Sequence, residues 1–174
     1  MHRTALEYGK EFFDLYIKDK LSNGIIVDIG SQDVNGSLKS VAPLQNNKYI
    51  GVDYAWGKGV DVVLTDPYVL PFSDNFCEVI VSSSCLEHSE FFWLTFNEMA
   101  RILKPNGFIY INVPTNCWYH AYPVDCWRFY KDSGKALEKW AVRSGHKIKL
   151  VESFVGISDE SNNNDYVAIF TKEL

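Results

Sequence analysis

The sequence lacks three features that would each define a class of protein: a long apolar run, paired cysteines and an excess of positive charge. No apolar run approaches the roughly 20 residues that cross a membrane, and the charged first twenty residues predict no signal peptide. The four cysteines form no C-x-x-C pair, so they predict neither a zinc ribbon nor a disulfide scaffold. Seventeen basic residues stand against twenty-two acidic ones, and the net charge of -5 disfavours nucleic acid as a partner. These absences predict a cytoplasmic protein with no nucleic-acid partner and no membrane span.

The length and composition are those of one globular domain. The chain has 174 residues, of which 47% are hydrophobic and 22% are charged, and domains are typically about 100–150 residues long. No linker rich in Pro, Gly or Ser divides the sequence. We therefore predict a single domain over residues 1–174.

Short apolar runs alternate with helical patterns along the chain. Strands are expected at 25–30, 49–53, 60–64, 77–83, 108–113, 148–155 and 166–171. Helices are expected within the first twenty residues and over 90–103 and 133–144, with a turn at 104–107. This order predicts a doubly wound, mostly parallel seven-stranded α/β sheet with an antiparallel C-terminal hairpin. Residues 91–94, an aromatic run, are expected in the core or in a contact that would make a homo-oligomer.

Polar residues and glycine follow the ends of the predicted strands, where open parallel sheets bind ligands. The first strand runs into Asp28 and Gly30, and the second ends in Asp53, a position suited to a ribose. The G-x-G-x-x-G fingerprint is absent, because Gln32 occupies the second glycine position; this disfavours a pyrophosphate and hence a nicotinamide dinucleotide. S-adenosylmethionine carries a ribose without phosphate, and its positive groups suit neighbouring carboxylates. The strand ends therefore favour this cofactor.

Several segments stand in the order found in one enzyme family. They are D-I-G-S at 28–31, G-V-D at 51–53, D-P-Y-V-L-P-F at 66–72, L-E-H at 86–88 and E-M-A-R-I-L-K-P-N-G-F at 98–108. With these segments the sequence resembles the class I (Rossmann-like) S-adenosylmethionine-dependent methyltransferases over nearly its whole length. D-V-N-G-S at 33–37 and H-A-Y-P-V-D-C-W-R-F-Y at 120–130 are similar to segments of small methyltransferases associated with polysaccharide biosynthesis.

The resemblance implies a Rossmann-like methyltransferase fold and a cofactor site along the strand ends. The positions that match are Asp28, Gly30 and Ser31 for the turn beneath the methionine part, Asp53 and Tyr54 for the ribose and adenine, Asp66 and Pro67 for the adenine pocket, and Ser82 and Ser83 for contacts at the end of the fourth strand.

Methyl transfer to a hydroxyl needs alignment and a base that takes the proton. His88 and His120 follow the fourth and fifth strands and are the candidate bases, and Asp125 is expected to orient His120. We predict no metal, since spacing alone does not support a metal site; a divalent ion held by His120, Asp125 or Glu87 is the alternative.

The segment 118–130 combines aromatic and ionisable residues and is expected to form the acceptor pocket. Its aromatic rings offer flat faces to sugars, and its charged groups offer hydrogen bonds. The substrate-binding candidates are Tyr122, Trp127 and Arg128. The alternative is a covering loop whose aromatic residues only pack on the sheet.

The leading hypothesis is an O-methyltransferase that acts on a sugar hydroxyl of a glycan or glycoconjugate. Three alternatives remain open: methylation of another small molecule, a non-catalytic module that binds cofactor or glycan, and a nicotinamide-dependent dehydrogenase. The fold does not decide among them, because one fold hosts many functions.

Overall fold

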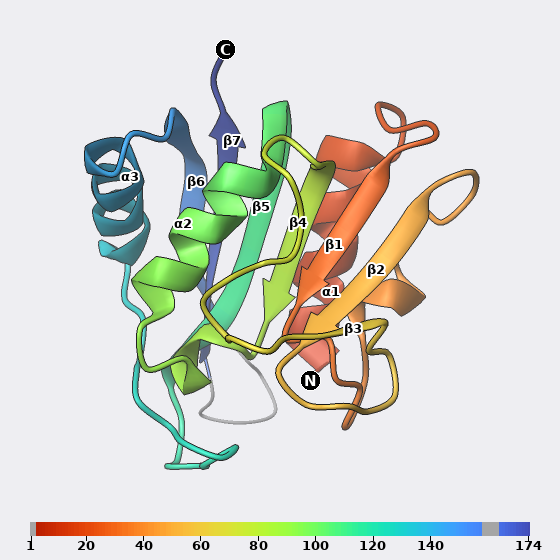
Figure 1. Ribbon diagram of the computed structural model, residues 1–174. Helices are drawn as coiled ribbons and strands as arrows, with labels where there is room; N and C mark the ends of the chain where they lie inside the picture. The colour runs from red at the N-terminus through yellow and green to blue at the C-terminus, as the bar shows by residue number, and fades with distance from the viewer. Residues whose placement is uncertain (1–2, 158–163) are drawn as a thin grey trace.

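A seven-stranded sheet forms the centre of the computed structural model, which describes residues 3–157 and 164–174 (Figure 1). The strands are β1 (Ile25–Ile29), β2 (Lys48–Asp53), β3 (Val62–Val63), β4 (Cys77–Ser83), β5 (Leu103–Asn116), β6 (Ile148–Gly156) and β7 (Asn164–Lys172). Their order in the sheet is β3-β2-β1-β4-β5-β7-β6. Strands β1 to β5 pair in parallel, whereas β7 pairs antiparallel with both β5 and β6. The predicted fold, including the antiparallel C-terminal pair, is confirmed.

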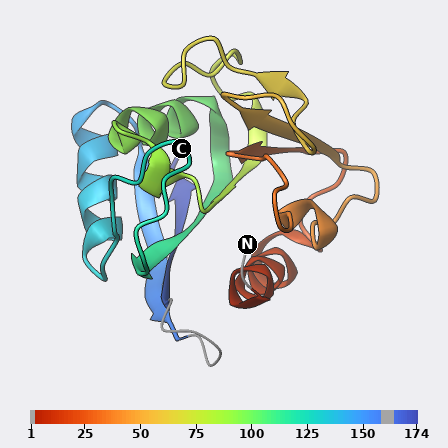
Figure 2. The ribbon, with the colours of Figure 1, turned by 90° about the horizontal axis from the view of Figure 1, so that it is seen from below.

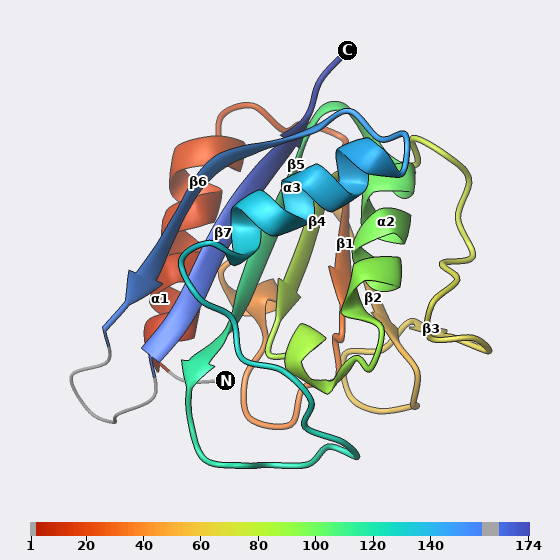
Figure 3. The ribbon, with the colours of Figure 1, turned by 90° about the vertical axis from the view of Figure 1, so that its left-hand side faces the viewer.

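Helices cover the two faces of the sheet unequally. Helix α1 (Arg3–Phe12) continues into a π-helical turn, η1 (Phe13–Ile17), on one face, and α2 (Phe92–Ile102) and α3 (Ser133–Arg143) lie on the other face (Figures 1 and 3). The chain passes from β1 to β2 with only the 3-10 turn η2 (Leu38–Ser40), and residues 64–76 join β3 to β4 without a helix. Among the described residues, no helix is long and apolar enough to cross a membrane.

Each face has its own apolar core. Phe12 of α1 stacks on Tyr110 of β5, with ring centroids 4.9 Å apart, and both side chains are fully buried. On the other face, Phe96 of α2 packs edge-on against Phe170 of β7 at 4.9 Å. Full burial of such a side chain contributes roughly 1.5–3 kcal/mol. The two cores thus pack both faces of the sheet behind the strand ends.

The loop between β3 and β4 takes the place of a helix over β1 and β2. Leu70 is 2% exposed and inserts into the core of this face. Glu98 of α2 accepts a hydrogen bond from the Leu70 amide at 2.8 Å, and Arg101 donates to the carbonyls of Leu70 and Phe72. Hydrogen bonds from the segment 98–108 therefore hold the segment 66–72 in place.

Two expectations from the sequence are wrong in detail. Strand β5 begins at Leu103, which already pairs with Cys77, and the expected turn at 104–107 is a bulge inside the strand. Deep burial is wrong for two residues of the run 91–94, since Phe91 is 47% and Leu94 39% exposed, whereas Phe92 packs against the core; the alternative, a subunit contact, stays a prediction. The buried side of α2 consists instead of Thr95, Phe96, Met99, Ala100 and Ile102.

Candidate functional site

A cavity of about 610 Å³ lies where the carboxyl ends of β1, β2 and β4 meet the short helix η3 (Leu86–His88). Residues 117–132, which we call the covering loop, run past this edge of the sheet, seen from below in Figure 2. The cavity brings together ten of the predicted site residues: Asp28, Gly30, Ser31, Asp53, Tyr54, Pro67, Ser83, His88, His120 and Tyr122. Its lining does not include Asp66, Ser82, Asp125, Trp127 or Arg128.

The turn after β1 requires glycine. Gly30 has a φ of 79°, and its amide and that of Ser31 both donate to the Val52 carbonyl, at 2.9 and 3.1 Å. A Cβ at Gly30 would lie 2.4 Å from the Cys85 Cβ. Hydrogen bonds therefore hold the turn on β2, and the absence of a Cβ lets it pack against Cys85 at the edge of the cavity.

Two carboxylates stand at the ends of β1 and β2. Asp28 is 5% exposed and accepts a hydrogen bond from the Tyr49 hydroxyl at 2.7 Å. Burial raises the pKa of Asp28 to about 7, and the hydrogen bond from Tyr49 opposes this rise. Asp53 accepts hydrogen bonds from the amides of Gln32 and Ala55, at 3.1 and 3.3 Å. This part of the cavity favours a positively charged ligand, because a cation restores the ionised form of Asp28.

Gln32 links three segments around the cavity. Its side-chain amide donates to the Trp56 carbonyl at 3.3 Å, and its Oε1 accepts a hydrogen bond from the Tyr122 hydroxyl at 2.8 Å. Gln32 therefore connects the first turn to the covering loop. The sequence marked Gln32 only as a missing glycine, and no local pattern pointed to Tyr122 as its partner.

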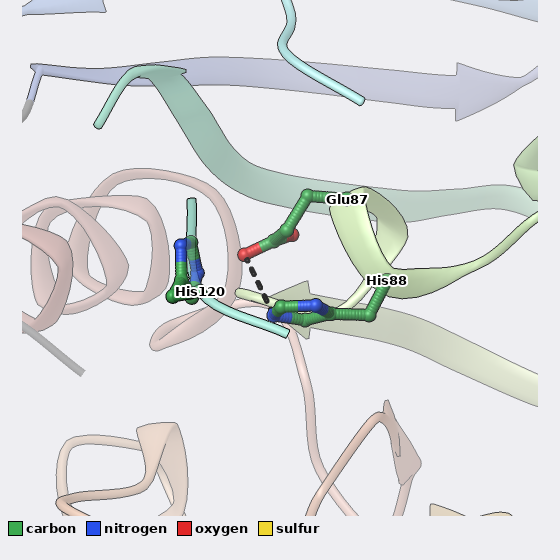
Figure 4. A group of neighbouring side chains, drawn as sticks. All are labelled: Glu87, His88 and His120. Carbon is green, nitrogen blue, oxygen red and sulfur yellow. Dashed lines mark ion pairs between the residues drawn. The ribbon is translucent and has the colours of Figure 1, made fainter. Parts of the chain in front are cut away.

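Glu87, His88 and His120 converge on the cavity (Figure 4). The His88 and His120 rings stand perpendicular, with centroids 5.0 Å apart, and Glu87 Oε1 lies 3.7 Å from His88 Nε2. Ser84, whose φ of 52° is in the left-handed region, turns the chain from β4 into the helix that carries Glu87 and His88. Three chemically active groups thus meet on one wall.

The electrostatics of this group are unusual. Neither oxygen of the buried Glu87 carboxyl has a hydrogen-bond partner within the described part of the chain, and burial raises its pKa to about 8. Burial lowers the pKa of His88, which favours the neutral form of the ring. The sequence contained Glu87 within its L-E-H segment, yet only the structure shows that the carboxyl and two imidazoles share a site.

Asp125 and Arg128 hold the covering loop together. The Asp125 carboxylate is 1% exposed and accepts two hydrogen bonds from Arg128, at 2.5 and 2.7 Å, and one from the His120 amide at 2.7 Å. The Arg128 guanidinium holds the pKa of that carboxyl well below its usual range, and it also donates to the carbonyls of Trp118 and Trp127. The position of Arg128 therefore argues against direct substrate binding. Asp125 positions His120 chiefly through its backbone, with the carboxylate 3.4 Å from the ring Nδ1.

Three other predicted residues have structural contacts instead of places in the cavity. Trp127 donates its indole N–H to the Ser89 carbonyl at 3.0 Å and lines a separate apolar cavity of about 390 Å³ beside Phe92. The exposed Asp66 carboxylate accepts from the Tyr68 amide at 2.8 Å. The Ser82 hydroxyl donates to the Ile29 carbonyl at 2.9 Å and is fully buried. Trp127 thus holds the covering loop, Asp66 stabilises the turn after β3, and Ser82 links β4 to β1.

Comparisons with known proteins agree with this architecture. Residues 27–111, just under half of the chain, match the family model described as a methyltransferase domain. No curated protein matches the sequence. Among solved structures, the chain is similar to the Burkholderia thailandensis 1,6-didemethyltoxoflavin-N1-methyltransferase, solved with bound 1,6-didemethyltoxoflavin and S-adenosylhomocysteine. That structure is 13% identical with a TM-score of 0.73, over 98% of this chain and 79% of that one.

Two further solved structures show how varied the chemistry on this fold is. The CurJ carbon methyltransferase is 15% identical with a TM-score of 0.69, over 98% of this chain and 54% of that one. The [4+2]-cyclase SpnF is 12% identical with a TM-score of 0.65, over 95% of this chain and 82% of that one. At these identities the likeness shows the fold, and the reaction has to be argued from the site.

Proposed function

We infer that the chain is a class I S-adenosylmethionine-dependent methyltransferase with a single domain over residues 1–174. The observation that carries this inference is the meeting of Asp28, Gly30 and Asp53 in one cavity, at the ends of adjacent parallel strands. The family match over residues 27–111 and the Rossmann-like methyltransferase fold support it.

The residues of the cavity fit S-adenosylmethionine. Asp28, whose pKa is raised to about 7, suits the cationic amino-acid part, and Gly30 allows that part to approach the backbone closely. Asp53 retains lone pairs for the two ribose hydroxyls beyond its bonds to Gln32 and Ala55. The half-exposed Tyr54 offers its ring to the adenine. The bound cofactor supplies a methyl group activated by positive sulfur.

The wall formed by Glu87, His88 and His120 is the acceptor side in this proposal. An acceptor hydroxyl there forms its new oxygen–carbon bond as the carbon–sulfur bond breaks, with the electron pair going to sulfur. The hydroxyl proton has to leave. His88 Nδ1 donates to the Val124 carbonyl at 2.6 Å and His120 Nδ1 donates to the Trp118 carbonyl at 2.9 Å, so Nε2 of each ring has a free lone pair for this proton.

We propose that the acceptor is a sugar hydroxyl of a glycan or glycoconjugate. Trp118 lines the cavity and is 87% exposed, and the neighbouring Tyr119 is 77% exposed. Such aromatic faces stack on sugar rings, which have one apolar face.

The four unpaired cysteine thiols support a cytoplasmic location, where such thiols persist.

Two measurements test the function. Calorimetry with S-adenosylhomocysteine and with NAD should show binding of the first and not of the second; the reverse result would mean a dehydrogenase. A screen with radiolabelled S-adenosylmethionine and a panel of sugars, glycans and other hydroxyl compounds should give a product heavier by one methyl group in place of a hydrogen. Cofactor binding without transfer to any acceptor would favour a non-catalytic module, and transfer only to non-sugar hydroxyls would exclude the glycan.

A further inference from the structure

We propose that Glu87, His88 and His120 bind one divalent first-row transition-metal ion at the acceptor side of the cavity. Each residue offers one ligand atom, and the three atoms lie within 4.8 Å of one another. Figure 4 shows the three side chains converging from η3 and from the covering loop. The catalytic use of the ion rests on the proposed function, whereas its binding does not.

Both imidazoles are already fixed as metal ligands usually are. A ligating histidine typically donates its other ring N–H to a carbonyl or carboxylate, which sets the tautomer and the direction of the lone pair. His88 Nδ1 donates to the Val124 carbonyl at 2.6 Å, and His120 Nδ1 donates to the Trp118 carbonyl at 2.9 Å. Two independent carbonyls therefore leave Nε2 as the donor atom of each ring.

Glu87 supplies the second, independent observation. Its carboxyl is fully buried, and neither oxygen has a hydrogen-bond partner among the residues that the structure describes. A buried polar group without a partner is costly, and a carboxylate in such a place calls for a cation. Arg128 does not meet this need, because both of its terminal nitrogens bond to Asp125. A bound ion does.

The ligand set indicates the class of metal. Two imidazoles and one carboxylate suit zinc, iron, cobalt or manganese better than magnesium or calcium, which prefer oxygen. Ligands about 2.1 Å from a tetrahedral ion lie about 3.4 Å apart, so the three atoms need to close by at most about 1.4 Å. Glu87 Oε1 and His88 Nε2, 3.7 Å apart, are almost at that spacing. Asp125 is not a ligand, because Arg128 and the His120 amide occupy its carboxylate.

The proposed metal site also indicates which hydroxyl compounds should be the better methyl acceptors. Three protein ligands leave one position for an acceptor oxygen on a four-coordinate ion and two on a five-coordinate ion. A cation lowers the pKa of a hydroxyl bound beside it, so the proton can pass to water rather than to a histidine. Acceptors with two neighbouring hydroxyls, such as the vicinal pair of a sugar ring, should therefore be methylated faster than those with one.

Metal binding can be measured without turnover. Untagged protein, stripped with a chelator, is titrated with Co²⁺ by calorimetry and by visible absorption, with Mg²⁺ as the comparison ion. We expect one Co²⁺ per chain, and at least tenfold weaker binding in each of Glu87→Gln, His88→Ala and His120→Ala. The matched controls are Glu90→Gln, which lies in the same cavity wall outside the group, and His146→Ala, between α3 and β6. Both should bind Co²⁺ like the unaltered protein. No saturable binding, or equal binding in all five variants, would overturn the site.

The same samples separate this proposal from the proposed function. If S-adenosylhomocysteine fails to bind while Co²⁺ binds through the group, the function is wrong and the site stands. If S-adenosylhomocysteine binds and transfer to an acceptor continues in the chelator-treated protein, the ion has no catalytic role and a histidine is the base. Loss of transfer on chelation and its return with Mn²⁺ or Zn²⁺ would support the catalytic role.

Discussion

Binding of S-adenosylmethionine should weaken as the pH falls from 8 to 6, because Asp28 has to be ionised to pair with a positive group. Burial raises the pKa of this carboxyl to about 7; Asp53 adds to the rise, and the Tyr49 hydrogen bond and the Lys39 charge oppose it. A protonated carboxyl offers no charge to the cofactor. Affinity is therefore highest above pH 7 and falls as the carboxyl takes up its proton.

The size of the effect follows from that pKa. With a value of about 7, about nine tenths of Asp28 is ionised at pH 8 and roughly one tenth at pH 6. The affinity should then drop roughly tenfold over this interval. At pH 7, each binding event should release about half a proton.

Isothermal calorimetry tests both numbers. Titrations at pH 6, 7 and 8 give the affinities, and buffers of different ionisation enthalpy give the proton release. Asp28→Asn should bind more weakly and lose the drop, whereas Tyr49→Phe should move the drop to higher pH, because the hydrogen bond that lowers the pKa is gone. Burial also raises the pKa of Glu87, to about 8, so Glu87→Gln is the control: the drop has to persist in this variant if it comes from Asp28. A flat profile in the unaltered protein, or an unchanged profile in Asp28→Asn, would refute the reasoning.

Three further predictions concern the cofactor, the first turn and the covering loop. Asp53→Ala should weaken S-adenosylhomocysteine binding about ten- to hundredfold in calorimetry, since a hydrogen bond to a charged group is worth about 1.5–3 kcal/mol; full affinity in a folded variant would exclude the ribose assignment. Gly30→Ala should lower the free energy of unfolding in urea by about 2–4 kcal/mol, because the new methyl group overlaps a neighbouring side chain at a positive φ. Gly145→Ala, also at positive φ but with open space around it, should lose less. Arg128→Lys should raise the acceptor KM or lower turnover in steady-state assays, with cofactor affinity within about threefold, because lysine lacks the paired hydrogen bonds that hold the loop; a loss confined to cofactor affinity would contradict this.

The sequence predicted the sheet because each strand has a local signature. Apolar, β-branched runs identified all seven strands, and β4 agrees residue for residue with its expected bounds. The start of β5 was missed because a turn-forming segment lies inside the strand as a bulge. The sequence also gave no sign that Arg101 holds the loop before β4 in place, since those hydrogen bonds join residues about thirty positions apart.

The strand-end residues of the cavity could be anticipated better than the covering loop. Asp28, Gly30 and Asp53 stand directly at strand ends, so the sheet alone fixes their place. The covering loop has no periodic pattern, and the direction of each side chain depends on partners distant in the sequence. The sequence did not reveal that Asp125 is the partner of Arg128. Arg128 was therefore predicted to bind the substrate, whereas its guanidinium bonds to Asp125.

The bond between Tyr122 and Gln32 has a consequence for how ligands enter and leave. The base of the covering loop is anchored on η3, through the Cys126 amide on the Glu87 carbonyl and the His88 ring on Val124, whereas its tip bonds to the first turn through the Tyr122–Gln32 pair. A neutral hydrogen bond contributes about 0.5–1.5 kcal/mol, so breaking it changes an opening equilibrium by only about two- to tenfold. We therefore expect the tip to separate from the first turn more readily than the base separates from η3, and this separation opens the cavity on the side of Gln32.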